Sequence, residues 1–232
     1  MKSIGVIGAM EEEISYLKAK MEVAYVKNIA GTDFISGHID SKSVVLVRCG
    51  IGMVNAAACA QVLCDLFRVS HIINIGVAGA LSPEVGIGDI VISEDLVQHD
   101  FDATIFGYAL GEIPQLNVKS FLPDFELVKI AQRAGGVVCP ERKTVKGRIV
   151  SGDRFISKAE ERQKLFNSFG AVCTEMEGAA IAQVCFLNKK PFVVIRAVSD
   201  NADDSAGISF GKFVEMAAKN SSDMAEYIIK EI

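Results

Sequence analysis

The stretch Cys173-Thr174-Glu175-Met176-Glu177-Gly178-Ala179-Ala180 decides the fold that we expect for this 232-residue chain. It follows a short apolar run over residues 171–173 and opens a helical pattern over residues 178–187, which predicts a turn from a strand into a helix. Open α/β sheets bind ligands at such turns, beyond the carboxyl ends of their strands. Glu175 and Glu177 could hydrogen-bond adjacent sugar hydroxyls there, with Met176 packed on the sugar face. The same acids also suit a helix N-terminus without any ligand, because its dipole favours negative charge.

A second informative segment is Pro191-Phe192-Val193-Val194-Ile195-Arg196-Ala197-Val198-Ser199-Asp200. Its nearly continuous apolar character predicts a strand that is covered on both faces. Charged groups at the end of a buried strand are costly unless they are paired or used. Arg196 and Asp200 therefore form either a structural salt bridge or part of a site.

The remaining chain alternates between strand and helix patterns, without a linker or an internal repeat. We expect further strands over residues 3–8, 24–29, 33–39, 43–49, 72–75, 88–92 and 144–150, and helices over 9–17, 56–67, 124–134, 158–169 and 209–229. This alternation predicts one α/β domain over residues 1–232, with a central mixed sheet flanked by helices on both faces in three layers.

Composition narrows the possible partners. The net charge is -5, from 24 Lys and Arg against 29 Asp and Glu, and no basic cluster is long enough to follow a phosphate backbone, so we expect no nucleic acid partner. The N-terminus runs into Glu11, Glu12 and Glu13 after a short apolar stretch, unlike a signal peptide. No apolar run reaches membrane-spanning length. We expect a cytoplasmic protein without a membrane partner.

The cysteines and histidines do not suggest a metal site. Six cysteines lie mostly in apolar runs without close pairing, and the three histidines, His38, His71 and His99, are scattered. We interpret the cysteines as reduced core residues and expect no metal and no cofactor.

The segment Gly50-Ile51-Gly52-Met53-Val54-Asn55 nearly matches the dinucleotide-binding fingerprint. Asn55 stands where the last glycine belongs, and no acidic residue ends a closely following strand. A Rossmann oxidoreductase is therefore the weaker alternative.

Taken together, these stretches resemble the nucleoside phosphorylase and nucleosidase superfamily, and within it the 5'-methylthioadenosine/S-adenosylhomocysteine nucleosidases. The resemblance spans nearly the whole chain in family order. It also rests on Gly5-Val6-Ile7-Gly8-Ala9-Met10-Glu11-Glu12-Glu13, Gly76-Val77-Ala78-Gly79, Gly88-Asp89-Ile90-Val91 and Ser151-Gly152-Asp153-Arg154-Phe155-Ile156.

The resemblance implies a nucleoside phosphorylase-like fold and hydrolysis of the N-glycosidic bond of 5'-methylthioadenosine and S-adenosylhomocysteine, and also of 5'-deoxyadenosine. Adenine and the 5'-substituted ribose would be released, in methionine salvage and the activated methyl cycle. The alternatives are a purine nucleoside phosphorylase, an aminodeoxyfutalosine nucleosidase of menaquinone synthesis, and a nucleoside-binding protein without catalytic activity.

The resemblance also implies roles for individual residues. Hydrolysis through a sugar cation needs an acid for the leaving base, a base for water and groups that tolerate a positive ribose. Asp200 would donate a proton to N7 of adenine and Glu13 would activate water. Glu177 would hold the ribose hydroxyls above Met176, and Arg196 would steady the acids.

Other positions complete the implied binding site. Phe155 would stack on the base while the backbone of Ile156 reads its edge, and Phe210 would cover the pocket. The further substrate-binding positions are Ala9, Met10, Ile51, Val77, Ala78, Glu175 and Ser199. In the family a loop of the neighbouring subunit reaches this pocket, which implies a homodimer in which Ala103, Phe106 and Pro114 come from the partner.

Three features set this chain apart within the superfamily. Val77 stands where many members carry a hydroxyl, so backbone groups must take over its contacts. Gly211 and Lys212 stand where many place an acid near the lid. Phosphorylases bind phosphate after the first strand with a glycine and an arginine, whereas this chain has Met10 and three glutamates there, which favours water as the nucleophile.

Overall fold

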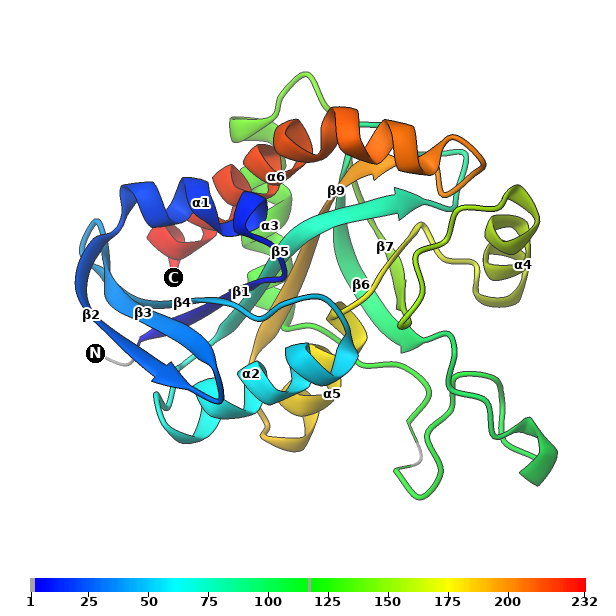
Figure 1. Ribbon diagram of the computed structural model, residues 1–232, viewed down its shortest axis with the longest axis horizontal. Coiled ribbons are helices and arrows are strands. Elements are labelled where there is room, and N and C mark those ends of the chain that lie inside the picture. Colours follow the sequence, from blue (N-terminus) through cyan, green and yellow to red (C-terminus); the bar gives the residue numbers. More distant parts are fainter. Residues whose placement is uncertain (1–2, 117) are drawn as a thin grey trace.

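The computed structural model describes residues 3–116 and 118–232, and the nine strands of this part form one sheet (Figure 1). The strands are β1 (Ile4–Gly8), β2 (Glu22–Ile29), β3 (Thr32–Ile39), β4 (Lys42–Arg48), β5 (Ile72–Ala80), β6 (Ile90–Gln98), β7 (Thr144–Ser151), β8 (Cys173–Glu175) and β9 (Phe192–Asp200). The helices are α1 (Glu11–Lys20), α2 (Met53–Asp65), η1 (Thr104–Phe106), α3 (Phe125–Val138), α4 (Ala159–Phe169), α5 (Gly178–Leu187) and α6 (Ala206–Glu231).

The sheet closes on itself at one end. Its order is β2-β3-β4-β1-β5-β8-β7-β6-β9, and β5 pairs with β9 as well as with β8. The strands β1, β5 and β9 are mutually parallel, whereas β8 runs antiparallel to β5 and meets only its last residues. The carboxyl ends of β1, β5 and β9 and the short strand β8 therefore converge on one place.

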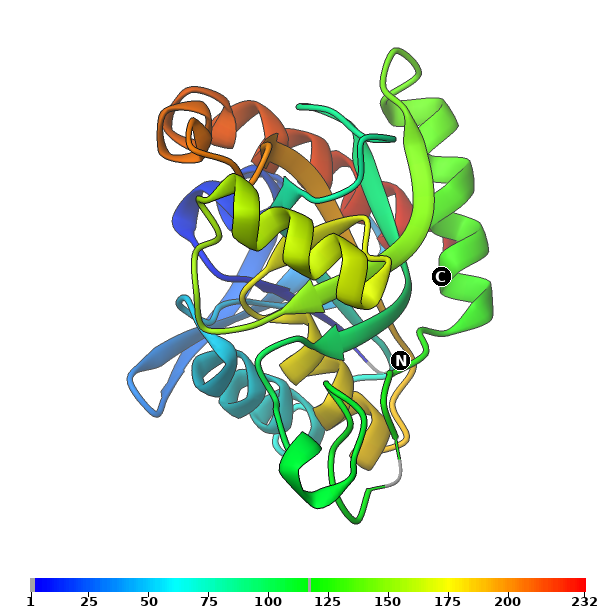
Figure 2. The ribbon, with the colours of Figure 1, turned by 90° about the vertical axis from the view of Figure 1, so that its right-hand side faces the viewer.

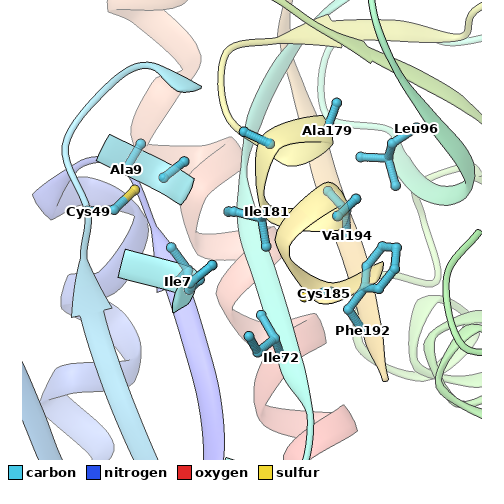
Figure 3. Packing of buried hydrophobic residues seen from close by; sticks show 14 of the residues in the cluster. Ile7, Ala9, Cys49, Ile72, Leu96, Ala179, Ile181, Cys185, Phe192 and Val194 are labelled. Atoms are coloured by element: carbon cyan, nitrogen blue, oxygen red, sulfur yellow. The ribbon is translucent and has the colours of Figure 1, made fainter. Parts of the chain in front are cut away.

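Helices cover both faces of the sheet. Figure 1 shows α1 and α6 above it and α2 and α5 below it, and each layer has its own core. The core between the sheet and helices α2 and α5 includes Ile7, Ile181 and Val194 (Figure 3). The core between the sheet and helices α1, α3 and α6 includes Leu17 and Ile73. In Figure 2 α4 lies in front of the closed end, over a third, smaller core. The predicted α/β class, with a mixed sheet covered on both faces, is confirmed.

Several predicted boundaries were wrong, mostly because the elements are longer. β5 continues through the small residues 76–80, and β6 extends to Gln98. α2 begins earlier, at Met53, α3 passes through two glycines to Val138, and α6 begins at Ala206. Small residues and glycines weaken the local pattern, but neighbouring strands and helices supply the hydrogen bonds and packing that extend each element.

Within residues 3–116 and 118–232, no helix combines the length and the apolar character that a membrane crossing requires.

Two adjacent glycines near the end of α3 give a matched test of this packing. A Cβ at Gly135 would lie 2.3 Å from Oγ1 of Thr144, whereas one at Gly136 meets nothing within 4 Å. We expect Gly135→Ala to lower the free energy of unfolding by about 1–3 kcal/mol through overpacking. Gly136→Ala should raise it by up to about 1 kcal/mol through helix propensity. Urea unfolding measures both, and equal effects of the two variants would contradict the α3–β7 packing.

Candidate active site

One cavity lies where the strand ends converge, and its wall holds thirteen of the residues predicted for the site. They are Ala9, Met10, Glu13, Ile51, Val77, Ala78, Phe155, Glu175, Met176, Glu177, Ser199, Asp200 and Phe210. Ile156 lines a smaller cavity beside it, which shares Phe155, Thr174 and Asp200 with the larger one. Arg196 does not line the cavity itself, but it forms ion pairs with Glu175 and Glu177 of its wall.

Glu13 is the only one of the three consecutive glutamates that is buried. Its carboxylate accepts hydrogen bonds from the N–H groups of Ala9 (2.6 Å) and Met10 (3.1 Å), which precede α1, and from Val77 N–H (3.0 Å) in β5. Val77 thus contributes its backbone, as expected from its lack of a hydroxyl. Burial raises the pKa of Glu13, although the charge of Arg196 and the three N–H bonds oppose the rise. Glu11 and Glu12 lie on the exposed side of α1.

Glu175 and Glu177 have different surroundings despite their similar positions. Glu175 accepts hydrogen bonds from Arg196, Ser151 and the N–H groups of Glu177 and Gly178. Burial by itself would raise its pKa, but Arg196 and these donors hold the pKa below the usual value. Oε2 therefore already has three donors, whereas Oε1 has only the hydroxyl of Ser151. That Glu175 binds a sugar hydroxyl stays a prediction.

Glu177 retains one carboxyl oxygen that can bind a ligand. One oxygen accepts a hydrogen bond from Gly52 N–H (2.9 Å), and the other lies 3.9 Å from Arg196. Burial and the neighbouring charge of Glu175 raise the pKa of Glu177 to about 8. This carboxyl therefore lines the cavity with one oxygen free of strong partners.

Arg196 is 1% exposed and holds the acids together. Its Nη2 donates to Glu175 and to Oδ1 of Asn74 (2.8 Å), while Nδ2 of Asn74 donates to the carbonyl of Ile7 (2.9 Å). The salt bridge between Arg196 and Asp200 that the sequence suggested is absent from the ion pairs of residues 3–116 and 118–232. β9 pairs with β5 over its whole length and with β6 only around Arg196. Four residues along a strand separate Arg196 and Asp200 by about 13 Å.

Gly76 in β5 leaves room for the carboxylate of Glu13 and the guanidinium of Arg196 to approach each other. A Cβ at Gly76 would lie 2.6 Å from Oε1 of Glu13 and 2.8 Å from Nη1 of Arg196. Any side chain at this position would therefore displace the acid, the guanidinium or both.

Asp200 lies apart from this cluster, at the end of β9. Its carboxyl accepts from the hydroxyl of Ser199 (2.8 Å) and from Ala202 N–H (2.8 Å). Burial raises the pKa of Asp200 and the charge of Asp203 adds to the rise, although the hydrogen bonds from Ala202 and Ser199 oppose it. The protonated form, which can donate a proton, is thus favoured.

Aromatic and apolar side chains complete the cavity. The rings of Phe155 and Phe210 meet edge to face, with centroids 5.8 Å apart, and both line the cavity together with Met176 and Ile51. Phe155 is 48% exposed, so it can offer a ring face to a flat ligand.

The structure adds two lining residues that the sequence reasoning missed, Gly79 and Thr174. The family motif emphasises the acids that follow Thr174. The position of Thr174 at a strand end could have indicated it as a site residue. Ala103, Phe106 and Pro114 are not among the residues that line this cavity. In the part of the chain that the structure describes, no group of three or more His, Cys, Asp or Glu side chains could hold a metal ion.

Comparison with known proteins identifies the family of this arrangement. The profile of the "Phosphorylase superfamily" matches residues 3–230. The chain belongs to the phosphorylase superfamily.

Within the phosphorylase superfamily, several similar proteins are 5'-methylthioadenosine/S-adenosylhomocysteine nucleosidases. A 5'-methylthioadenosine/S-adenosylhomocysteine nucleosidase of Staphylococcus saprophyticus is 43% identical over 231 residues, covering 99% of this chain and 100% of that protein. The Neisseria meningitidis nucleosidase of the same name, in complex with methylthio-immucillin-A, has a TM-score of 0.96 at 40% identity, with complete coverage of both chains. A futalosine hydrolase of Helicobacter pylori has a TM-score of 0.94 at 31% identity, covering 100% of this chain and 98% of that one.

The carboxyl of Glu177 makes stability depend on pH. Its pKa is about 8 in the folded chain against a usual 4.5, so the folded state keeps a proton that the unfolded chain has released. The free energy of unfolding should therefore fall as the pH rises from 5 to 8 and level off above that range. In Glu177→Gln, which cannot ionise, we expect this fall to be smaller by on the order of 1 kcal/mol or more.

Urea unfolding between pH 5 and 9 measures the difference. Glu160→Gln, at an exposed position of α4, is the matched control and should follow the wild type. The same pH dependence in Glu177→Gln and wild type would contradict the buried carboxyl pair.

Proposed function

We propose that this protein hydrolyses the N-glycosidic bond of 5'-methylthioadenosine and S-adenosylhomocysteine, releasing adenine. The observation that carries the proposal is the presence of two differently held acids, Glu13 and Asp200, in the wall of one cavity. Its nucleosidase relatives at 43% identity and a neighbour bound to a methylthio ligand support this substrate class. An aminodeoxyfutalosine nucleosidase is the second candidate, supported by the futalosine hydrolase at 31% identity.

The two acids suit opposite steps of the reaction. Asp200, whose protonated form is favoured by burial, donates a proton to N7 of the leaving adenine. Glu13 takes a proton from the water that attacks C1' of the ribose. Its three N–H donors keep the carboxylate in place, and both they and the charge of Arg196 oppose the rise of its pKa, which favours the ionised form that a base requires.

The surrounding groups hold the sugar and stabilise its positive charge. Glu177, with one oxygen free of strong partners, accepts hydrogen bonds from the ribose hydroxyls, and Met176 packs beneath the ring. The carboxylate of Glu13 favours the cationic ribose of the transition state. Phe155 stacks on the adenine, and Phe210 closes the cavity against it.

The same geometry disfavours phosphate as the nucleophile. A phosphate dianion in place of water would face the carboxylate of Glu13. At about 4 Å one like charge costs on the order of 4 kcal/mol at a surface-like effective dielectric, which matches the whole binding free energy of a millimolar ligand. Water meets no such repulsion.

We also propose a homodimer located in the cytoplasm. Ile105 and Phe106 are 88% and 79% exposed, in a loop that leaves the body of the molecule after β6 (Figures 1 and 2). Exposed apolar residues at a loop tip suit insertion into a second copy, where Ala103, Phe106 and Pro114 would extend the wall for the 5' substituent. Six free, buried cysteines are compatible with a reducing compartment.

Product analysis tests the proposed reaction. Purified protein should release adenine from methylthioadenosine at the same rate with and without phosphate. Glu13→Gln should abolish turnover with an unchanged melting temperature, and Asp200→Asn should lose roughly 100- to 10,000-fold while still binding substrate analogues. Glu12→Gln, on the exposed side of the same helical turn, is the control and should keep full activity.

Each contrary result has a distinct meaning. Ribose 1-phosphate among the products would replace the nucleosidase by a phosphorylase. Binding without adenine release would indicate a nucleoside-binding protein, and a strong preference for aminodeoxyfutalosine in a substrate panel would favour the second candidate.

The dimer has its own test. Light scattering at assay concentration should give twice the monomer mass. Phe106→Ala should raise KM for 5'-alkylthio substrates several-fold, with little effect on free adenine as an inhibitor, because the ring would contact only the 5' end. A monomer with full activity would rule out the shared site.

A further inference from the structure

Thr174 carries a buried hydroxyl whose position no structural role explains. The residue is 5% exposed, and its Oγ1 has no hydrogen-bond partner among residues 3–116 and 118–232. A buried polar group without a partner costs about 1–3 kcal/mol, and such groups are rare in folded proteins. The cost is recovered only if something absent from the free fold bonds to this oxygen.

The fold places this hydroxyl in the wall of the cavity. Thr174 lies in β8, paired with Gly79 of β5 and Val150 of β7. It lines both the main cavity and the smaller one beside it. Gly79, its partner in β5, has no side chain that could cover Thr174 on that side.

The neighbours of Thr174 indicate which part of a ligand would meet it. The smaller cavity is also lined by Phe155, Ile156, Asp200 and Met176, but not by Glu177. Under the proposed function Phe155, Ile156 and Asp200 face the purine base, Glu177 faces the sugar, and Met176 lies between the two. A hydroxyl beside the first group would meet the base, whose ring nitrogens and amino group accept or donate hydrogen bonds.

We propose that Thr174 is a substrate-binding residue whose hydroxyl hydrogen-bonds the polar edge of the base. This inference rests on the proposed function and adds a residue that the family motifs do not point to. A site built to hydrogen-bond a polar group loses affinity when one partner is removed, because the other is left buried without a bond.

Thr174→Val separates binding from stability, because valine keeps the shape and removes only the hydroxyl. We expect a roughly three- to tenfold rise in both KM for methylthioadenosine and Kd for adenine, the range for one neutral hydrogen bond. The melting temperature should stay the same or rise, since an unpaired buried hydroxyl disappears. Thr174→Ser, which retains the hydroxyl, should bind within about twofold of the wild type.

Thr144→Val is the matched control. The hydroxyl of Thr144 is also buried without a partner in the described chain, but the residue lies at the start of β7 and does not line the cavity. This variant should leave KM and Kd unchanged.

Two results would overturn the inference. One is an unchanged KM and Kd in Thr174→Val, and the other is a lowered melting temperature in that variant, which would reveal a structural bond. Wild-type protein that releases no adenine would instead overturn the proposed function, so the two failures are distinguishable.

Discussion

The site depends on one buried positive charge, the guanidinium of Arg196. A lone ion in the interior costs several kcal/mol, so this guanidinium requires carboxylates around it, and the carboxylates in turn require it. Glu175 forms the close pair, and Asn74 accepts a hydrogen bond from the same Nη2 of the guanidinium. The charge of Arg196 also lowers the pKa values of Glu13 and Glu177, but by less than their burial raises them. Both therefore have raised pKa values, and this incomplete compensation leaves them able to exchange protons and to bind polar ligands.

Closure of the sheet is what assembles these groups. β5 pairs with β1, β8 and β9, which are widely separated in the sequence. The helix α1 that follows β1, and the strands β8 and β9, each deliver one or more polar residues to the same place. The small residues at the end of β5 make this possible, since any Cβ at Gly76 would occupy the space between Glu13 and Arg196. The same residues that weaken the strand pattern in the sequence are thus required by the site.

Two buried polar atoms at this site have no hydrogen-bond partner within the described residues, Oγ1 of Thr174 and Nε of Arg196. A third, Nε2 of His99, lies against Gly152. Fold stability alone would favour apolar groups at such positions. Their presence fits the general observation that functional sites retain locally unfavourable groups whose cost the rest of the fold offsets.

The sequence by itself determined the fold class and most of the site. Apolar runs and helical periodicity depend on local residues, and strand ends on one edge of a sheet place Glu13, Glu177 and Asp200 together without knowledge of their contacts. Only the tertiary structure decided which acid pairs with Arg196 and that Thr174, in the wall of the cavity, has a buried hydroxyl without a partner in the described chain. Those outcomes depend on strand closure and on the direction in which each side chain leaves its strand. Strand closure and side-chain direction determine which groups are shielded from water. This desolvation sets the pKa values that distinguish a structural carboxylate from a reactive one.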